Sequence, residues 1–216
     1  MQNNMSSRGM TAGSIFALLN EMWPNAQCEL EHYSDFQLLI AVVLSAQATD
    51  KSVNKAMNPI LTQNKNFNSK DLVDMGQQNF LNAIRSIGLA PTKAKNCFNI
   101  ALILEQKYQG KVPLDREALE SLPGVGRKTA NVVLNVVCKL PTMAVDTHVE
   151  RVSKRIGLVP VSANRLQVEE QLLKIVPTKY AVQAHHLLIF HGRYHCVARN
   201  PKCLTCPLEK LCKKNI

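Results

Sequence analysis

A lysine beside a glycine-containing turn is the residue of this sequence best suited to covalent chemistry. Lys128 comes two residues after the segment 122–126, which reads LPGVG, and Asp146 lies 18 residues further along the chain. An unprotonated amine attacks electrophilic carbon, and a carboxylate can take its proton or stabilise positive charge on a sugar ring. Two ordinary roles compete with this interpretation: a solvated phosphate contact for Lys128, and a helix N-cap for Asp146.

The glycine turn predicts a binding site for one phosphate group. Gly124 and Gly126 allow positive φ and a close approach of the backbone. The N–H groups of the two glycines and of the following helix start then point outward, where the helix dipole favours an anion. An ordinary turn between two helices is the alternative interpretation.

Four cysteines near the end of the chain predict a metal centre. Cys196, Cys203, Cys206 and Cys212 have the spacing C-x6-C-x2-C-x5-C, so four thiolates lie within 17 residues. Soft sulfur ligands favour zinc or an iron–sulfur cluster, and the spacing alone does not choose between them. The remaining cysteines, Cys28, Cys97 and Cys138, are expected to be small buried residues.

The balance of charge predicts a polyanionic partner. Lys and Arg number 26 and Asp and Glu 16, which gives a net charge of +10 and a pI of about 9.4. The last 26 residues hold six basic residues and one acidic residue, together with the four cysteines. Nucleic acid is the first candidate for the partner. The loop between the first two cysteines contains Arg199 and Lys202, which suit contact with a phosphate backbone.

Composition and the pattern of apolar residues also argue against a membrane protein and against a secreted one. No apolar stretch approaches the ~18 residues that a membrane helix needs, and the N-terminus lacks the pattern of a secretory signal. We therefore expect a cytoplasmic protein, associated with the nucleoid in a bacterium, whose thiols stay reduced. With 216 residues, of which 46% are hydrophobic, the chain can form one large domain or two small ones.

The pattern of apolar residues predicts an all-α protein. Residues 33–46 are apolar nearly all round, which is typical of a helix buried in the middle of a bundle. Further helices are expected at 93–108, at 116–122 with Asp115 as cap, and at 127–137, 149–156, 164–175 and 180–191, the last ended by Gly192. No segment alternates as a strand would. Lys128 would thus lie in the first turn of one helix, and Asp146 just before another.

Five motifs together resemble the endonuclease III family of base excision repair enzymes. They are LPGVGRKTAN at 122–131, VDTH at 145–148, LSAQATD at 44–50, HGRY at 191–194 and the four-cysteine tail. The turn is similar to a helix-hairpin-helix motif, which holds the DNA backbone without reading its sequence. The resemblance implies two helical domains flanking a DNA-binding cleft: a six-helix barrel at 28–140, and an iron–sulfur cluster domain made of 1–27 and 141–216.

The resemblance also implies a role for each matching residue. The implied partner is double-stranded DNA with an oxidised pyrimidine or an abasic site, the damaged base being flipped out of the stack, and a monomer is expected. Lys128 would attack C1′ to form a Schiff base, with Asp146 assisting, and β-elimination would then nick the strand. The four cysteines would hold a 4Fe-4S cluster. Implied DNA contacts are Gln47 in the gap left by the flipped base, Leu89 as a second wedge, and Leu122, Gly124, Gly126, Arg127, Arg199 and Lys202.

Other relatives and other classes of protein fit the sequence less well. The adenine glycosylase that acts opposite oxidised guanine lacks a lysine at the position of Lys128, and 8-oxoguanine glycosylases usually lack the cysteine tail. A DNA-binding module without catalysis would need neither Lys128 nor Asp146. For a redox protein whose main function is electron transfer, the basic loop inside the cysteine motif argues for DNA contact instead. The sequence therefore favours a bifunctional DNA glycosylase and abasic-site lyase.

Overall fold

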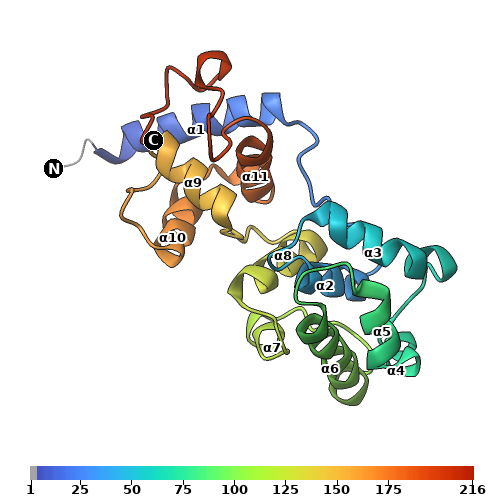
Figure 1. The fold of residues 1–216 in the computed structure, drawn as a ribbon. Helices are drawn as coiled ribbons and strands as arrows, with labels where there is room; N and C mark the ends of the chain where they lie inside the picture. The colour runs from blue at the N-terminus through green and yellow to red at the C-terminus, as the bar shows by residue number, and fades with distance from the viewer. Residues whose placement is uncertain (1–3) are drawn as a thin grey trace. The chain divides into compact units, whose positions relative to one another are not determined.

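The computed structural model of the chain describes residues 4–216 (Figure 1). All regular elements within this range are helical, which confirms the predicted all-α class. The chain divides into two compact units, residues 29–138 and residues 139–216 with the N-terminal segment up to residue 28. The predicted boundaries were at 28 and 140. Across the described residues, no helix combines the length and the hydrophobicity needed to cross a membrane.

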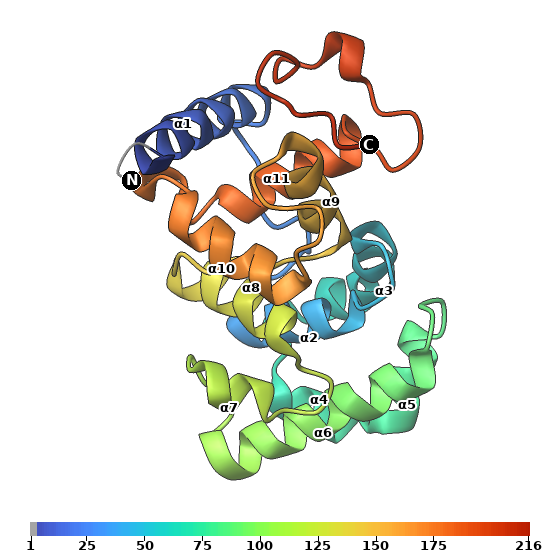
Figure 2. The same ribbon diagram turned by 90° about the vertical axis from the view of Figure 1, so that its left-hand side faces the viewer.

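The first unit, residues 29–138, contains seven α-helices where the sequence predicted a barrel of six. They are α2 (Asp35–Leu44), α3 (Asp50–Gln63), α4 (Ser69–Met75), α5 (Gln77–Ile84), α6 (Ala90–Tyr108), α7 (Arg116–Glu120) and α8 (Arg127–Cys138). Gly76, with a φ of +79°, ends α4 and begins α5, which makes two short helices of one segment. The long helix α6 packs against both of them (Figure 2).

Helix α2 forms the centre of this unit, as its uniformly apolar sequence predicts. Every residue from Phe36 to Leu44 is buried. The helix starts at Ser34, whose hydroxyl accepts a hydrogen bond from the N–H of Gln37 at 3.3 Å. It packs against α3, α6 and α8. Because α8 rests on this buried centre, the end of α8 that carries Lys128 has a fixed support.

The second unit is built on the remaining helices. They are α1 (Asn4–Met22), α9 (Thr147–Ile156), α10 (Arg165–Ile175) and α11 (Ala184–Tyr194), with the short 3-10 helices η1 (Thr178–Tyr180) and η2 (Cys203–Thr205). Helix α11 packs against α9 and α1 around one hydrophobic core. Asn164 begins α10 with a reciprocal capping box to Gln167. The cysteine tail follows α11 directly and has no longer helix than η2.

Gly192 does not end the last helix, so that prediction was wrong. It lies inside α11, which runs to Tyr194, and it is buried. A Cβ at this position would lie 2.9 Å from the Cβ of His148 and 3.1 Å from the Cγ2 of Val152, both on α9. The glycine is therefore needed for the close approach of α11 to α9. The expected start of this helix at residue 180 also differs, because residues 178–180 form η1 instead.

Replacing Gly192 by alanine should therefore destabilise the protein. Inserting a methyl group against two fixed helical residues is overpacking, and we expect a loss of about 1–3 kcal/mol in the free energy of unfolding. Urea denaturation followed by circular dichroism measures this. Gly88→Ala is the matched control, because nothing lies within 4 Å of the Cβ it would add. Equal stability of the two variants would contradict the packing role of Gly192.

Candidate functional site

The turn between α7 and α8 leaves backbone donors open to an anion. Gly124 has a φ of +75°, whereas Gly126 has no positive φ and open space where its Cβ would be. Within the turn, the N–H of Val125 donates to the carbonyl of Leu122 at 3.1 Å. The N–H groups of Gly124 and Gly126 meet no acceptor in residues 4–216. Gly124 thus supplies the left-handed bend, and Gly126 leaves space for a close approach of a ligand to the backbone. The sequence suggested that both glycines would do both.

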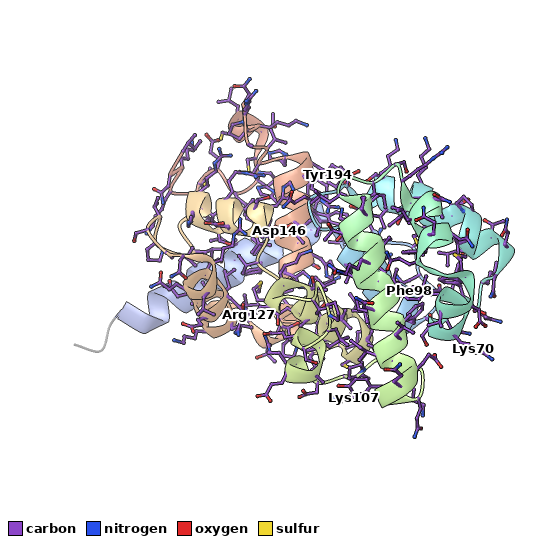
Figure 3. All side chains as sticks on the ribbon, turned by 60° about the horizontal axis from the view of Figure 1, so that its bottom comes forward. Lys70, Phe98, Lys107, Arg127, Asp146 and Tyr194 are labelled. Atoms are coloured by element: carbon purple, nitrogen blue, oxygen red, sulfur yellow. The ribbon has the colours of Figure 1, made fainter. Side chains whose placement is uncertain are left out.

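The residues around the turn differ in exposure. Leu122 is 2% exposed, so its side chain shapes the turn from beneath. Arg127 and Lys128 are exposed in the first turn of α8, where no acidic side chain occurs (Figure 3). The next residues of α8, from Ala130 to Asn135, are buried. The amine is therefore carried by a firmly packed helix, beside free backbone donors and without a carboxylate from its own turn.

The two predicted wedge residues share an unusual backbone conformation. Gln47 has a φ of +55° and Leu89 a φ of +61°, a region that side chains other than glycine rarely adopt. Both are exposed, and Leu89 keeps 60% of its surface accessible. They belong to the same unit as the turn and Lys128. An exposed leucine in a costly conformation is a residue that internal packing does not explain.

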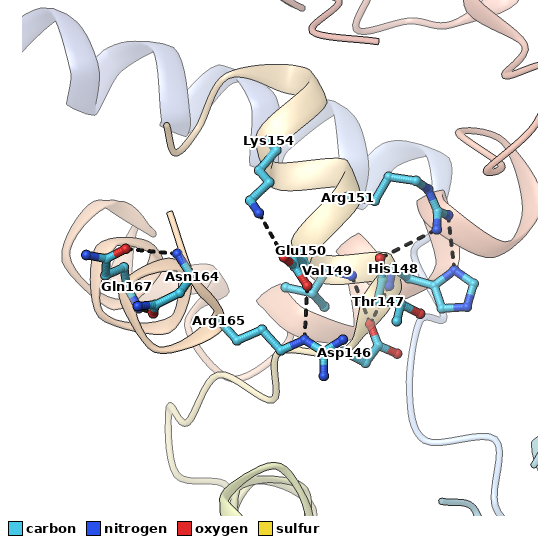
Figure 4. A network of polar contacts seen from close by, with 10 residues as sticks. All are labelled: Asp146, Thr147, His148, Val149, Glu150, Arg151, Lys154, Asn164, Arg165 and Gln167. Carbon is cyan, nitrogen blue, oxygen red and sulfur yellow. Dashed lines mark hydrogen bonds and ion pairs between the residues drawn. The ribbon is translucent and has the colours of Figure 1, made fainter. Parts of the chain in front are cut away.

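Asp146 caps α9, which confirms its expected structural role. Its Oδ1 accepts hydrogen bonds from the N–H groups of His148 and Val149, both at 2.8 Å (Figure 4). No donor among the described residues reaches Oδ2. The carboxylate is half-buried. One oxygen therefore anchors the side chain while the other stays available, so the capping role and a chemical role do not exclude each other.

The next turn of α9 joins Asp146 to the cysteine tail. The Nη2 of Arg151 lies 3.2 Å from the Nδ1 of His148 and donates to the carbonyl of Gly192 at 2.8 Å and to that of Cys196 at 3.2 Å. Because arginine only donates, the Nδ1 of His148 must be the acceptor. Burial, the largest cause, lowers the pKa of His148, and the nearby Arg151 also lowers it. This imidazole is therefore neutral at physiological pH and serves as a structural link.

The four cysteines of the tail surround a single pocket. Cys196, Cys203, Cys206 and Cys212 all line it. None of them forms a disulfide. No three His, Cys, Asp or Glu side chains in the described range converge as they would around one metal ion. The donor set is thus four soft sulfur ligands around a shared space, which suits a multinuclear cluster.

Hydrogen bonds from α9 and from the end of the chain hold this tail in place. Arg155 donates to the carbonyls of Val197 at 2.8 Å and Ala198 at 2.9 Å, and its Nη1 lies 3.7 Å from the Sγ of Cys196. The N–H of Lys214 donates to the Sγ of Cys212 at 3.3 Å. Donors aimed at sulfur stabilise thiolates, as metal ligation requires.

Burial raises the pKa of the Cys206 and Cys212 thiols. Both thiols are therefore protonated at neutral pH when no metal is bound, since desolvation disfavours the thiolate. A bound iron centre reverses this preference by direct charge neutralisation. Binding of a metal centre by these two thiols is thus coupled to the release of their protons.

The basic residues of the tail are accessible. Arg199 and Lys202 are exposed, and the Nζ of Lys202 donates to the carbonyl of Tyr194 at 3.3 Å. Of the three other cysteines, Cys97 is buried as expected, whereas Cys28 and Cys138 are only partly buried.

Two buried titratable residues were not identified from the sequence. His191, within HGRY, is 1% exposed, and its Nε2 lies 3.8 Å from the Sγ of Cys206. Lys93 is 4% exposed, its ammonium has no hydrogen-bond partner in the described part of the chain, and burial lowers its pKa. The position of His191 five residues before Cys196 was a usable signal. For Lys93 the only signal was its place one turn before Cys97 on α6.

Two segments of the chain match models of known protein families. Residues 40–178 match the HhH-GPD superfamily of base excision DNA repair proteins. Residues 196–212, which begin and end on cysteines of the tail, match the iron-sulfur binding domain of endonuclease III. Endonuclease III of Rickettsia conorii is 48% identical over 198 residues, covering 92% of this chain and 93% of its own.

Two solved structures give the same result in three dimensions. A trapped endonuclease III–DNA covalent intermediate has 46% sequence identity and a TM-score of 0.86, covering 94% of this chain and 96% of that one. A non-covalent endonuclease III–DNA complex has 46% identity and a TM-score of 0.87, covering 94% and 95%. Similarity therefore extends over nearly the whole length of each chain.

Replacing one cysteine of the tail should abolish metal loading. Cys203→Ser removes a soft ligand from the set, and we expect the purified protein to lose its iron and its visible absorbance. Iron and sulfide analysis per protein chain is the measurement. Cys138→Ser is the matched control, since Cys138 is also half-buried but lies outside the tail. A Cys203→Ser protein with a full complement of iron would contradict the assignment.

Proposed function

Because the chain belongs to the endonuclease III family, within the HhH-GPD superfamily of base excision DNA repair proteins, we propose that Lys128 and Asp146 carry out its chemistry. Members of this family are DNA glycosylases and abasic-site lyases, so the protein is a bifunctional enzyme that acts on double-stranded DNA. It carries a 4Fe-4S cluster. We propose oxidised pyrimidines as its class of damaged base.

The observation that carries the assignment of Lys128 is its place beside the open turn. The amine is exposed two residues after Gly126. The N–H groups of Gly126 and Gly124 have no acceptor among the residues that the structure describes. A phosphate bound by these donors would hold a DNA strand at the start of α8. The trapped covalent DNA intermediate of the similar endonuclease III supports covalent chemistry by a side chain of this family.

The proposed reaction first removes the damaged base and then cuts the strand. The unprotonated amine of Lys128 attacks C1′ of the damaged nucleotide, a nitrogen–carbon bond forms, and the glycosidic bond breaks as the base leaves with a proton. Loss of a proton from the nitrogen and opening of the sugar ring give a Schiff base at C1′. Removal of a proton from C2′ then expels the 3′ phosphate, which nicks the strand, and water later releases the enzyme.

Asp146 is proposed as the acid–base partner in this sequence. Its Oδ1 is fixed by the N–H groups of His148 and Val149, which leaves Oδ2 to accept a proton or to face positive charge on the sugar. A carboxylate held by backbone donors has few alternative rotamers and needs little reorganisation during the reaction.

The remaining predicted residues fit supporting roles. Gln47 and Leu89 are proposed to fill the duplex where the base is flipped out, because both are exposed at left-handed positions. Arg127, Arg199 and Lys202 are proposed as contacts to phosphate. The four cysteines of the tail are proposed as the cluster ligands, and the bound cluster would fix the basic loop between the first two. We also propose a cytoplasmic location beside the chromosome, where the substrate is found.

Lys128→Gln tests the proposed nucleophile. With duplex DNA that contains one thymine glycol or one abasic site, borohydride should trap wild-type protein as a covalent adduct and trap none of the variant. Lys70→Gln is the matched control, because Lys70 is also exposed and is also the second residue of its helix, α4 (Figure 3). We expect its adduct yield to equal that of wild type. An adduct of normal yield with Lys128→Gln would refute the assignment.

Asp146→Asn separates the chemical role of Asp146 from its capping role. Asparagine caps helices about as well as aspartate, so the free energy of unfolding should change by less than about 0.5 kcal/mol. Loss of the carboxylate should lower the single-turnover rate by about 10²- to 10⁴-fold. Asp115→Asn is the control, because Asp115 caps α7 in the same way, with its Oδ1 2.9 Å from the N–H of Ala118. Equal rates for the two variants would show that Asp146 only caps α9.

A further inference from the structure

Gly124 is in direct contact with a side chain from another helix. A Cβ placed on Gly124 would lie 2.5 Å from the Nδ2 of Asn96, 3.1 Å from its Cγ and 3.3 Å from its Cβ. No other residue has atoms among the three nearest. Asn96 lies on α6, 28 residues earlier in the chain and in the same unit. The carboxamide therefore lies against the backbone of the turn, at the residue with the left-handed φ.

The Asn96 carboxamide has hydrogen-bonding capacity to spare. It is half-buried, and its side chain makes no hydrogen bond to another residue of the described chain. Gly124, next to it, is exposed, and its N–H also lacks an acceptor. An amide placed at a turn only to fill space would normally bond to a carbonyl of that turn. Here two adjacent donors, one from the backbone and one from a side chain, remain unused.

We propose that Asn96 is a phosphate ligand that completes the anion site of the turn. Its Nδ2–H₂ donates to the same phosphate group that accepts from the N–H groups of Gly124 and Gly126. This inference rests on the proposed phosphate site at the turn, and it adds a side-chain donor from α6 to a site otherwise made of backbone. The contact also couples α6 to the turn, because the Asn96 side chain can only lie where it does while position 124 lacks a Cβ.

Asn96 is uncharged, and this distinguishes its proposed role as a phosphate ligand from that of a lysine or arginine. A neutral amide adds a hydrogen bond to an anion, which strengthens binding, but it releases no counterion from the DNA. Its removal should therefore lower affinity without changing the slope of log K against log salt concentration. Removal of a cationic contact lowers that slope by about 0.9 per phosphate.

The first test is equilibrium binding to a duplex that contains one tetrahydrofuran abasic-site analogue, which the enzyme cannot cleave. Fluorescence anisotropy over a range of salt concentrations gives affinity and slope together. We expect Asn96→Ala to weaken binding about tenfold with an unchanged slope. Asn96→Asp, which keeps the shape of the side chain but replaces the donor with a carboxylate, should weaken binding more than Asn96→Ala does. Asn99→Ala, another half-buried asparagine of α6, should bind as wild type does.

Two results would overturn the proposal. Asn96→Ala with wild-type affinity would mean that the side chain donates nothing to DNA. A loss of affinity in Asn96→Ala and none in Asn96→Asp would assign the effect to packing. Thermal unfolding of each variant is recorded beside binding, and a ligand role predicts that Asn96→Asp stays within a few degrees of wild type.

A double substitution tests the contact itself. Gly124→Ala introduces a methyl group 2.5 Å from the Nδ2 of Asn96, so it should unfold at a lower denaturant concentration than wild type. Combined with Asn96→Ala, part of that loss should be recovered, because the partner of the clash is gone. Strictly additive effects would contradict the contact. Borohydride trapping by wild-type protein is measured separately, so failure of the proposed lyase function is distinguished from failure of the Asn96 assignment.

Discussion

Backbone N–H groups at the start of a helix need acceptors. Such acceptors are supplied by a side chain at the start of α9 and are missing, within the described residues, at the turn before α8. At α9, the Oδ1 of Asp146 satisfies two of the N–H groups at 2.8 Å. At the turn before α8, the N–H groups of Gly124 and Gly126 have no acceptor in the described residues, and the first turn of α8 contains no acidic side chain. A helix start without an internal anion is a binding site for an external one. The proposed chemistry depends on this difference, because one start fixes a carboxylate and the other positions DNA beside an amine.

The cysteine tail, residues 196–212, is held in place mainly by contacts with other segments and not by helices of its own. It has almost no regular structure of its own, and only 3-10 helix η2 lies within it. Arg151 and Arg155, one turn apart on α9, instead donate hydrogen bonds to the carbonyls of the first cysteine, Cys196, and of the two residues that follow it. Partial burial raises the pKa of the Cys206 and Cys212 thiols, so both are uncharged in a metal-free tail at neutral pH. The loop that carries Arg199 is held by these hydrogen bonds from α9, and the tail is anchored to the core of its unit through Leu208.

Features that depend on local sequence could be predicted, and features that depend on distant contacts could not. The buried helix α2, the cap at Asp115 and the cap at Asp146 follow from composition and from the preferences of single positions. Gly192 was misread because a glycine that ends a helix and a glycine that lets two helices touch look alike in sequence. Only the atoms of His148, 44 residues away, distinguish them.

The same limit applies to Asn96. Nothing near it in the sequence indicates that the side chain lies at Gly124, because the contact crosses from α6 to the turn. The motif LPGVG predicts an anion site from backbone donors alone. The further donor becomes visible only when the neighbouring helix is in place. The sequence motif therefore predicts only the backbone donors of the proposed site, and the side-chain donor from α6 is found only in the folded structure.

The left-handed conformations of Gln47 and Leu89 carry a conformational cost that fits their proposed contact with DNA. Gln109 and Lys139, which have similar φ values, directly follow the ends of α6 and α8, where such a conformation is usual. Leu89 instead precedes a helix, contributes no side-chain cap and leaves most of its surface exposed. A residue other than glycine in such a conformation costs about 1–3 kcal/mol, and glycine would avoid this cost at either position. Because neither side chain contributes burial to offset it, the strain is best explained by a need for these two side chains at fixed positions outside the fold.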